Sequence, residues 1–129
     1  MDKTTTEINH LKEGGFILID DVPCKVDRVT ISTSGKHGHS KVRVDAIGLM
    51  DGTRRSIIKP GGETVQVPIV EKKNGQVISI AGNKAQIMDL TDFSVFELDI
   101  PPEKKDKVRQ GEEIFYFTVG EIKTLKELK

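Results

Sequence analysis

Closely spaced turn signals are the feature that most restricts how this 129-residue chain can fold. Pairs of Asp, Asn and Gly recur at short intervals between apolar runs, whereas helix signals are scarce. Asn-Gly and Asp-Gly favour tight hairpins, because both central residues of such a turn take a positive φ. The pairs are Asp20-Asp21, Asp51-Gly52, Gly61-Gly62, Asn74-Gly75 and Gly82-Asn83. We therefore expect most of the chain to be β.

Between these turns, apolar and polar side chains alternate with a period of two, which places one face of each strand in a core and the other in water. The alternation changes parity between Val26 and Val29, and again between Val95 and Phe96 within residues 93–100. Each change predicts a β-bulge or a sharp bend of the kind that closes a small barrel.

The chain divides near residue 70 into two parts of similar length. About five expected strands fall on each side, and Phe16 is the only aromatic residue before that point. We therefore predict an all-β protein of two small barrels, residues 1–69 and 70–129, each near the lower size limit for an independent core. The one helical turn expected is in residues 101–110, which begin with two prolines and precede Gly111.

Several classes of protein are excluded by features that the chain lacks. No run approaches 18 apolar residues, and the N-terminus has no apolar signal region, so we expect neither a membrane span nor a signal peptide. Cys24 is the only cysteine, which excludes an internal disulfide and a cysteine-based zinc site. It alternates in phase with Val22 and Val26, which predicts a buried structural thiol.

A neutral total charge hides a basic stretch. The chain has 20 Lys and Arg against 20 Asp and Glu, yet residues 25–59 hold eight cations, three anions and two histidines. Such an excess suits contact with nucleic-acid phosphate, and lysines that protect strand edges explain it equally well. The cations are Lys25, Arg28, Lys36, Lys41, Arg43, Arg54, Arg55 and Lys59.

Residues 32–41 contain no apolar side chain and lie between two apolar, alternating strands, which predicts the tip of a long hairpin. Gly35 and Gly38 would permit a tight turn and a close approach of the backbone to a partner. Lys36 would then project from the apex. The side chains expected to flank it are His37, His39 and Lys41.

Catalytic and metal-binding readings of this segment are weak. A phosphate-binding P-loop is rejected, because Thr30 stands where its first Gly should be and His37 where its Ser or Thr should be. His37 and His39 could face a metal, but a third ligand would have to be His10 or a distant carboxylate. Two histidines in a turn make a weak site, so we expect no metal, and we expect no cofactor. No nucleophile, base and orienting group occur together, so we expect no enzyme.

The segment Ser-Gly-Lys-His-Gly-His-Ser-Lys, residues 34–41, closely resembles the hypusine loop of the translation initiation factor 5A family, the archaeal and eukaryotic counterpart of bacterial elongation factor P. Ser34 replaces the usual Thr or Pro of that loop and Ser40 the usual Ala, both with small side chains. The lack of a third domain is expected to exclude a bacterial factor P, and the short ends suggest an archaeal rather than a eukaryotic member. The likeness extends to residues 11–16, 22–25, 51–52, 59–60, 67–73, 75–78 and 86–90.

This resemblance implies an SH3-like barrel in residues 1–69, which carries the loop 32–41, and an OB-fold in residues 70–129. It implies that Lys36 receives an aminobutyl group from spermidine, giving deoxyhypusine, and then hypusine if the side chain is hydroxylated. The modifying enzyme, deoxyhypusine synthase, uses NAD and would take this protein as its substrate.

The resemblance also implies a cytoplasmic, monomeric translation factor that binds the ribosome beside peptidyl-tRNA and promotes peptide-bond formation at stalling sequences such as consecutive prolines. The added amine would orient the substrate without acid–base chemistry of its own. The residues expected beside tRNA and rRNA are His37, His39, Lys41 and Arg43, then Arg54, Arg55 and Lys59, which a solvated strand edge explains as easily.

Two other classes share some of these features. Biotinyl and lipoyl carrier domains also display a modified lysine on a hairpin tip, but its neighbours are apolar or acidic, unlike those in Gly35-Lys36-His37. A plain ribosomal or KOW-type RNA-binding protein would need no modification, and Lys36→Arg would then cost little.

Overall fold

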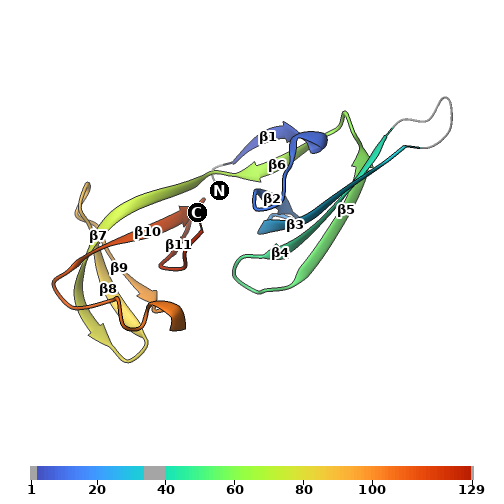
Figure 1. The fold of residues 1–129 in the computed structure, drawn as a ribbon. Coiled ribbons are helices and arrows are strands. Elements are labelled where there is room, and N and C mark those ends of the chain that lie inside the picture. The colour runs from blue at the N-terminus through green and yellow to red at the C-terminus, as the bar shows by residue number, and fades with distance from the viewer. Residues whose placement is uncertain (1–2, 34–39, 129) are drawn as a thin grey trace. The chain divides into compact units, whose positions relative to one another are not determined.

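The computed structural model describes residues 3–33 and 40–128, and these are built of strands and two short 3-10 helices, with no α-helix (Figure 1). The chain divides into two compact units, Met1–Ile69 and Val70–Lys129. Among the residues that the structure describes, helices with the length and hydropathy of a membrane span are absent.

The first unit is built on a four-stranded antiparallel sheet with its strands in chain order, and a separate two-stranded sheet packs against it through β2 and β6. The larger sheet holds β2 (Phe16–Ile19), β3 (Val22–Ser32), β4 (Lys41–Gly48) and β5 (Arg54–Pro60). The smaller sheet pairs β1 (Lys3–Glu7) with β6 (Thr64–Pro68), and a 3-10 helix, η1 (Ile8–His10), follows β1.

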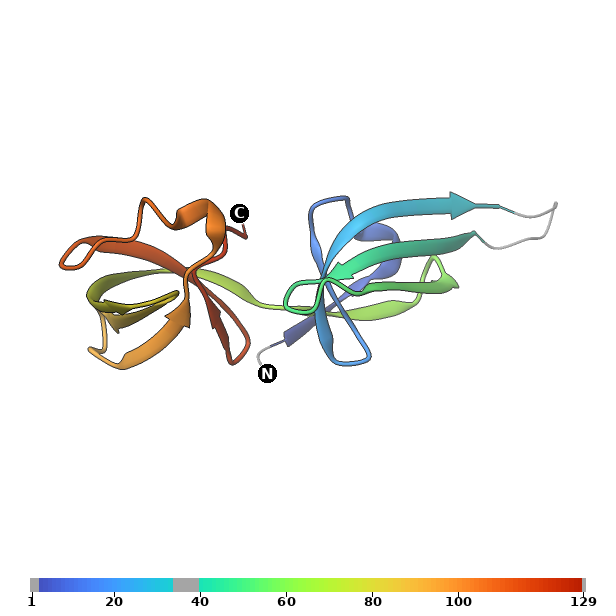
Figure 2. The same cartoon turned by 90° about the horizontal axis from the view of Figure 1, so that it is seen from below.

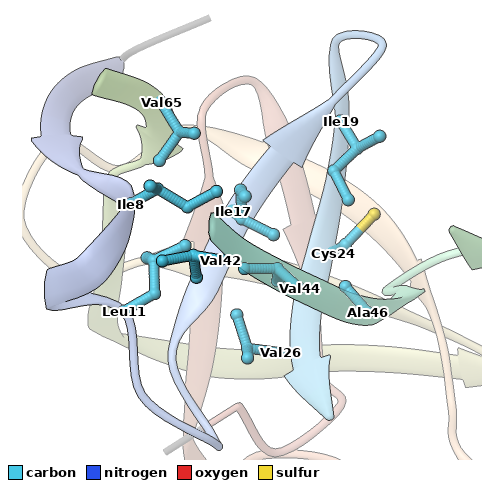
Figure 3. Close-up of a cluster of buried hydrophobic side chains, with 10 residues drawn as sticks. All are labelled: Ile8, Leu11, Ile17, Ile19, Cys24, Val26, Val42, Val44, Ala46 and Val65. Atoms are coloured by element: carbon cyan, nitrogen blue, oxygen red, sulfur yellow. The ribbon is translucent and has the colours of Figure 1, made fainter. Parts of the chain in front are cut away.

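An aliphatic core fills this unit. Val42 and Val44 alternate inward along β4 and are fully buried. Figure 3 shows them among side chains from the other strands, including Ile17 of β2. Cys24 lies completely buried in the same cluster, which confirms the prediction of a structural thiol. Each such aliphatic side chain contributes about 1.5–3 kcal/mol through its burial.

The second unit is one five-stranded antiparallel sheet in the order β11-β10-β7-β8-β9, curled into a nearly closed barrel (Figure 2). Its core includes Val77, Ile87 and Tyr116. The helical turn expected in residues 101–110 is a single 3-10 turn, η2 (Pro102–Lys104), followed by the buried Val108. The strands are β7 (Val70–Ala81), β8 (Lys84–Asp89), β9 (Val95–Asp99), β10 (Glu113–Val119) and β11 (Ile122–Thr124).

The predicted fold class is confirmed: the protein is all-β, with an SH3-like half-barrel sheet and an OB-type barrel. One predicted bulge is present, since Val26 pairs with Ala46 and Arg28 pairs with Asp45, which leaves Asp27 as an extra residue.

The bulge predicted near Val95 and Phe96 is wrong. The strands β8 and β9 pair without any register shift, and the bulge of this unit lies at Ile78 of β7 instead. The apparent change of parity arises because the apolar Val95 lies on the exposed side of β9, whereas Phe96 and Leu98 face the core.

A buried polar pair ties the end of β8 to β10. The Tyr116 hydroxyl donates to Oδ2 of Asp89, while Oδ1 accepts the backbone N–H groups of Thr91 at 2.7 Å and Asp92 at 3.0 Å. The hydrogen bond from Tyr116 is the main reason that the pKa of Asp89 lies below its ordinary value. The carboxylate therefore fixes both the barrel wall and the turn that follows it.

We predict that Tyr116→Phe lowers the free energy of unfolding by about 1–3 kcal/mol, because it removes a donor from a buried carboxylate. The stability that Asp89 contributes is present above the ordinary Asp pKa of about 3.9 and is lost as the pH falls through the lower folded value. The variant should therefore lose less stability than wild type between pH 5 and pH 2. Urea unfolding across this range measures both effects.

A suitable control is Ser94→Ala, which removes an exposed hydroxyl bond to Asp92 in the same turn and should change stability far less. If Tyr116→Phe unfolded at the same urea concentration as wild type at pH 7, the Asp89–Tyr116 bond would have no such role.

Candidate nucleic-acid interface

The strand register decides which of the cations in residues 25–59 share a face. Lys41 and Arg43 are exposed on β4, whereas Val42 and Val44 beside them are buried. Directly paired residues of neighbouring strands lie on the same side of a sheet. Arg54 of β5 pairs with residue 47, which is in phase with Lys41 and Arg43, so all three cations lie on the outer side of the sheet.

The bulge in β3 adds two further cations to that side. Lys25 pairs with Ile47 and Arg28 pairs with Asp45, both outward positions of β4. Residues three apart in a regular strand face opposite sides, and the extra Asp27 brings these two to the same side. The basic face is defined here as Lys25, Arg28, Lys41, Arg43 and Arg54.

Sequence reasoning counted Lys25 and Arg28 in the charge excess but did not include them among the expected RNA contacts. The signal that could have found them was available, since the change of parity between Val26 and Val29 indicates the bulge. Because the bulge puts Lys25 and Arg28 on the same side of the sheet, both side chains can contact the same partner.

The carboxylates beside the basic face leave its cations accessible. Arg43 Nε lies 3.1 Å from Asp45 Oδ1, and Arg54 Nη1 lies 3.4 Å from Asp27 Oδ2. A hydrogen bond from Ser56 is the main reason that the pKa of Asp45 is lowered. Both arginine side chains are more than half exposed, so their ion pairs contribute little and can be exchanged for contacts with phosphate.

Arg55 lies on the other side of the sheet, because it pairs with the buried Ala46. Its two Nη atoms lie 2.9 and 3.2 Å from the carboxylate oxygens of Asp51, which also accepts the Thr53 N–H at 3.0 Å. The hydrogen bonds from Arg55 are the main cause of the low pKa of Asp51, about 2. Arg55 therefore fastens the turn between β4 and β5.

Lys59 is also separated from the basic face, since it pairs with the buried Val42. It lines a hollow of about 520 Å³ together with Asp20 and Asp21. The structure thus brings Lys41, Arg43 and Arg54 together, and places Arg55 and Lys59 apart from them.

Five of the expected site residues lie outside the described residues and stay predictions: Gly35, Lys36, His37, Gly38 and His39. Next to them, the N–H of Gly61 donates to the carbonyl oxygen of Ser40 at 3.0 Å. Within residues 3–33 and 40–128, no three His, Cys, Asp or Glu side chains form a group that could hold a metal ion. His10, the histidine considered as a third metal ligand, has its Nε2 atom 3.5 Å from Oε2 of Glu7.

Comparison with known proteins shows the family to which this chain is similar. The family profile described as translation initiation factor 5A-like, N-terminal, matches residues 2–63. The translation initiation factor 5A of Methanocella arvoryzae is 54% identical, over 94% of this chain and 95% of the relative. That of Archaeoglobus fulgidus is 48% identical, over 88% of this chain and 89% of the relative.

A solved structure agrees with these relatives. The structure titled eukaryotic translation initiation factor 5A from Methanococcus jannaschii matches with a TM-score of 0.83 and 34% identity, covering 91% of this chain and 87% of that one. The chain is therefore a translation factor with an SH3-like and an OB-type unit. It belongs to the translation initiation factor 5A family.

We predict that Arg55→Gln raises the pKa of Asp51 from about 2 toward the ordinary Asp value of about 3.9, because the main partner of the carboxylate is lost. NMR titration of the side-chain carboxyl carbons measures this shift. Arg54→Gln is the matched control, because its side chain is adjacent in sequence and lies on the other side of the sheet. An unchanged Asp51 pKa in Arg55→Gln would contradict the assignment.

Proposed function

We propose that this translation factor binds the ribosome beside peptidyl-tRNA and promotes peptide-bond formation at stalling sequences such as consecutive prolines. In this proposal, deoxyhypusine synthase transfers the aminobutyl group of spermidine to the side-chain amine of Lys36, which releases 1,3-diaminopropane and gives deoxyhypusine. A separate hydroxylation would convert deoxyhypusine to hypusine. The protein acts in the cytoplasm as a monomer, without a metal or cofactor of its own and without catalysing a reaction by itself.

The observation that carries the proposal is the basic face. Its cations lie on β3, β4 and β5, and Lys36 lies in the segment between the end of β3 at Ser32 and the start of β4 at Lys41. Clustered cations attract the phosphates of RNA regardless of sequence, which suits contact with a tRNA whose identity varies. Residues 1–69 contain only one aromatic side chain, Phe16, which favours phosphate contact over stacking on bases.

The modified lysine would act by orienting the tRNA substrate and not by acid–base chemistry. An aminobutyl extension adds a second amine and further hydrogen-bond donors at the end of a long arm. In the proposed mechanism, the basic face anchors the factor on the tRNA backbone, and the arm orders the acceptor end for reaction. His37 and His39 remain proposed neighbours of the tRNA.

Lys36→Arg tests the need for modification, because arginine keeps the positive charge but cannot accept the aminobutyl group. We expect loss of polyproline synthesis in a reconstituted translation assay, with an unchanged melting temperature. Lys41→Arg is the control and should keep most of its activity. Mass spectrometry of native protein should find the added aminobutyl mass on Lys36. Full activity of Lys36→Arg would return the protein to the class of plain RNA-binding modules.

Arg28→Ser tests the basic face. Each phosphate contact that is lost should reduce the slope of log affinity against log salt by about 0.7–0.9, and weaken binding to unrelated tRNAs alike. Fluorescence anisotropy with labelled tRNA between 50 and 200 mM salt measures the slope. Lys107→Ser, at an exposed position of the second unit, is the control. Equal effects of the two substitutions would argue against the basic face.

A further inference from the structure

The outer side of β8 and β9 carries a distinct surface in the second unit. Val95, Glu97 and Asp99 are exposed along β9, while Leu98 between them is buried. Their partners in β8 lie on the same side, with Met88 opposite Val95. The β8–β9 face is defined here as Lys84, Gln86, Met88, Val95, Glu97 and Asp99.

An exposed aromatic residue stands in the turn that leads into this face. The Phe93 side chain is 66% exposed, and its backbone φ is 61°. Its N–H donates to the Asp89 carbonyl oxygen at 2.9 Å, and the N–H of Ser94 donates to Asp92 at 2.9 Å, which fixes the turn. A bulky residue is strained at such a φ, where Asn or Gly fits more easily. Packing does not explain Phe93, since most of its surface meets water.

Negative charge surrounds these apolar groups. Glu97 and Asp99 lie on the face and Asp92 lies in the turn. Glu113 of β10 joins the same side, because Gln76 pairs with both Glu113 and Met88. Among the described residues of the face, Lys84 is the single cation. Its Nζ atom lies 3.6 Å from Oε1 of Glu97 and 3.7 Å from Oδ1 of Asp99. These ion pairs are weak, because all three side chains are more than half exposed.

We propose that the β8–β9 face and Phe93 together bind an extended, basic segment of a partner protein with an apolar anchor. Phe93 and Val95 receive the anchor, and the carboxylates receive Lys or Arg side chains. Val95, Glu97 and Asp99 follow one another at two-residue spacing, about 7 Å, which matches the side-chain repeat of an extended partner.

The charge distinguishes this occupant from RNA. β8 and β9 are the second and third strands of the OB-type unit, the strands whose face binds oligonucleotides in many OB-folds. Here the carboxylates of the face and its turn would repel phosphate and attract cationic side chains. The negative charge of this surface therefore disfavours binding of RNA and favours binding of a basic peptide.

The test uses the full chain and a fluorescein-labelled dodecapeptide of alternating Val and Lys. We expect binding by anisotropy and NMR amide shifts confined to residues 84–88 and 93–99. Phe93→Asn should weaken binding at least fivefold while raising the melting temperature, because it relieves the strained φ and removes the anchor. The double variant Glu97→Gln, Asp99→Asn should weaken binding at least as much.

Glu103→Gln, which removes one carboxylate from η2, is the control and should bind the peptide like wild type. A dodecamer of uridine should leave the amide signals of residues 93–99 unshifted. The proposal is overturned if Phe93→Asn and the double variant bind the peptide as tightly as wild type does, if Glu103→Gln weakens binding as much as they do, or if the oligouridine shifts the amide signals of residues 93–99.

Discussion

The phase of side chains along β3 is the constraint on which the first unit depends. A strand can bury its apolar residues and display its cations only while the two sets keep alternating. Asp27 resets this phase once, so that Val26 and Val29 both pack on the core while Lys25 and Arg28 both face outward. A regular strand would turn one valine to water or one cation toward the core. The inserted Asp27 thus allows both valines to pack on the core and both cations to lie on the basic face.

The two units share a way of fixing their turns. In each, an aspartate accepts a side-chain hydrogen bond from a strand residue, Arg55 for Asp51 and Tyr116 for Asp89. Each also accepts backbone N–H donors of its own turn, one for Asp51 and two for Asp89. The donor differs with the surroundings. Asp51 is accessible and is paired with a cation, whereas Asp89 is buried and is satisfied by a neutral hydroxyl. Ionised carboxylates at turn ends therefore shape the loops in both units.

Local sequence patterns predicted most of the strands, the division near residue 70 and the bulge after Val26, because turn residues and alternation act over a few positions. The turn expected at Asn74-Gly75 is wrong, since both residues lie inside β7 and pair with β10. The patterns also failed at Val95 and Phe96, since an exposed valine on the outer side of a strand interrupts the apparent alternation in the same way as a bulge does. They also could not assign sides in β5, where Arg54 and Arg55 precede two adjacent isoleucines and no alternation shows which arginine faces out. Pairing with β4 decides that question.

The separation of the two sides of β4 has an evolutionary consequence. Inward residues such as Val42 and Val44 determine stability, so substitutions there are costly. Outward residues such as Arg43 are solvated, and substitutions there change charge with little effect on folding. Screening by salt shortens the reach of each charge. Lineages whose cells differ in ionic strength can therefore adjust the number of cations on this surface one at a time, each intermediate remaining folded.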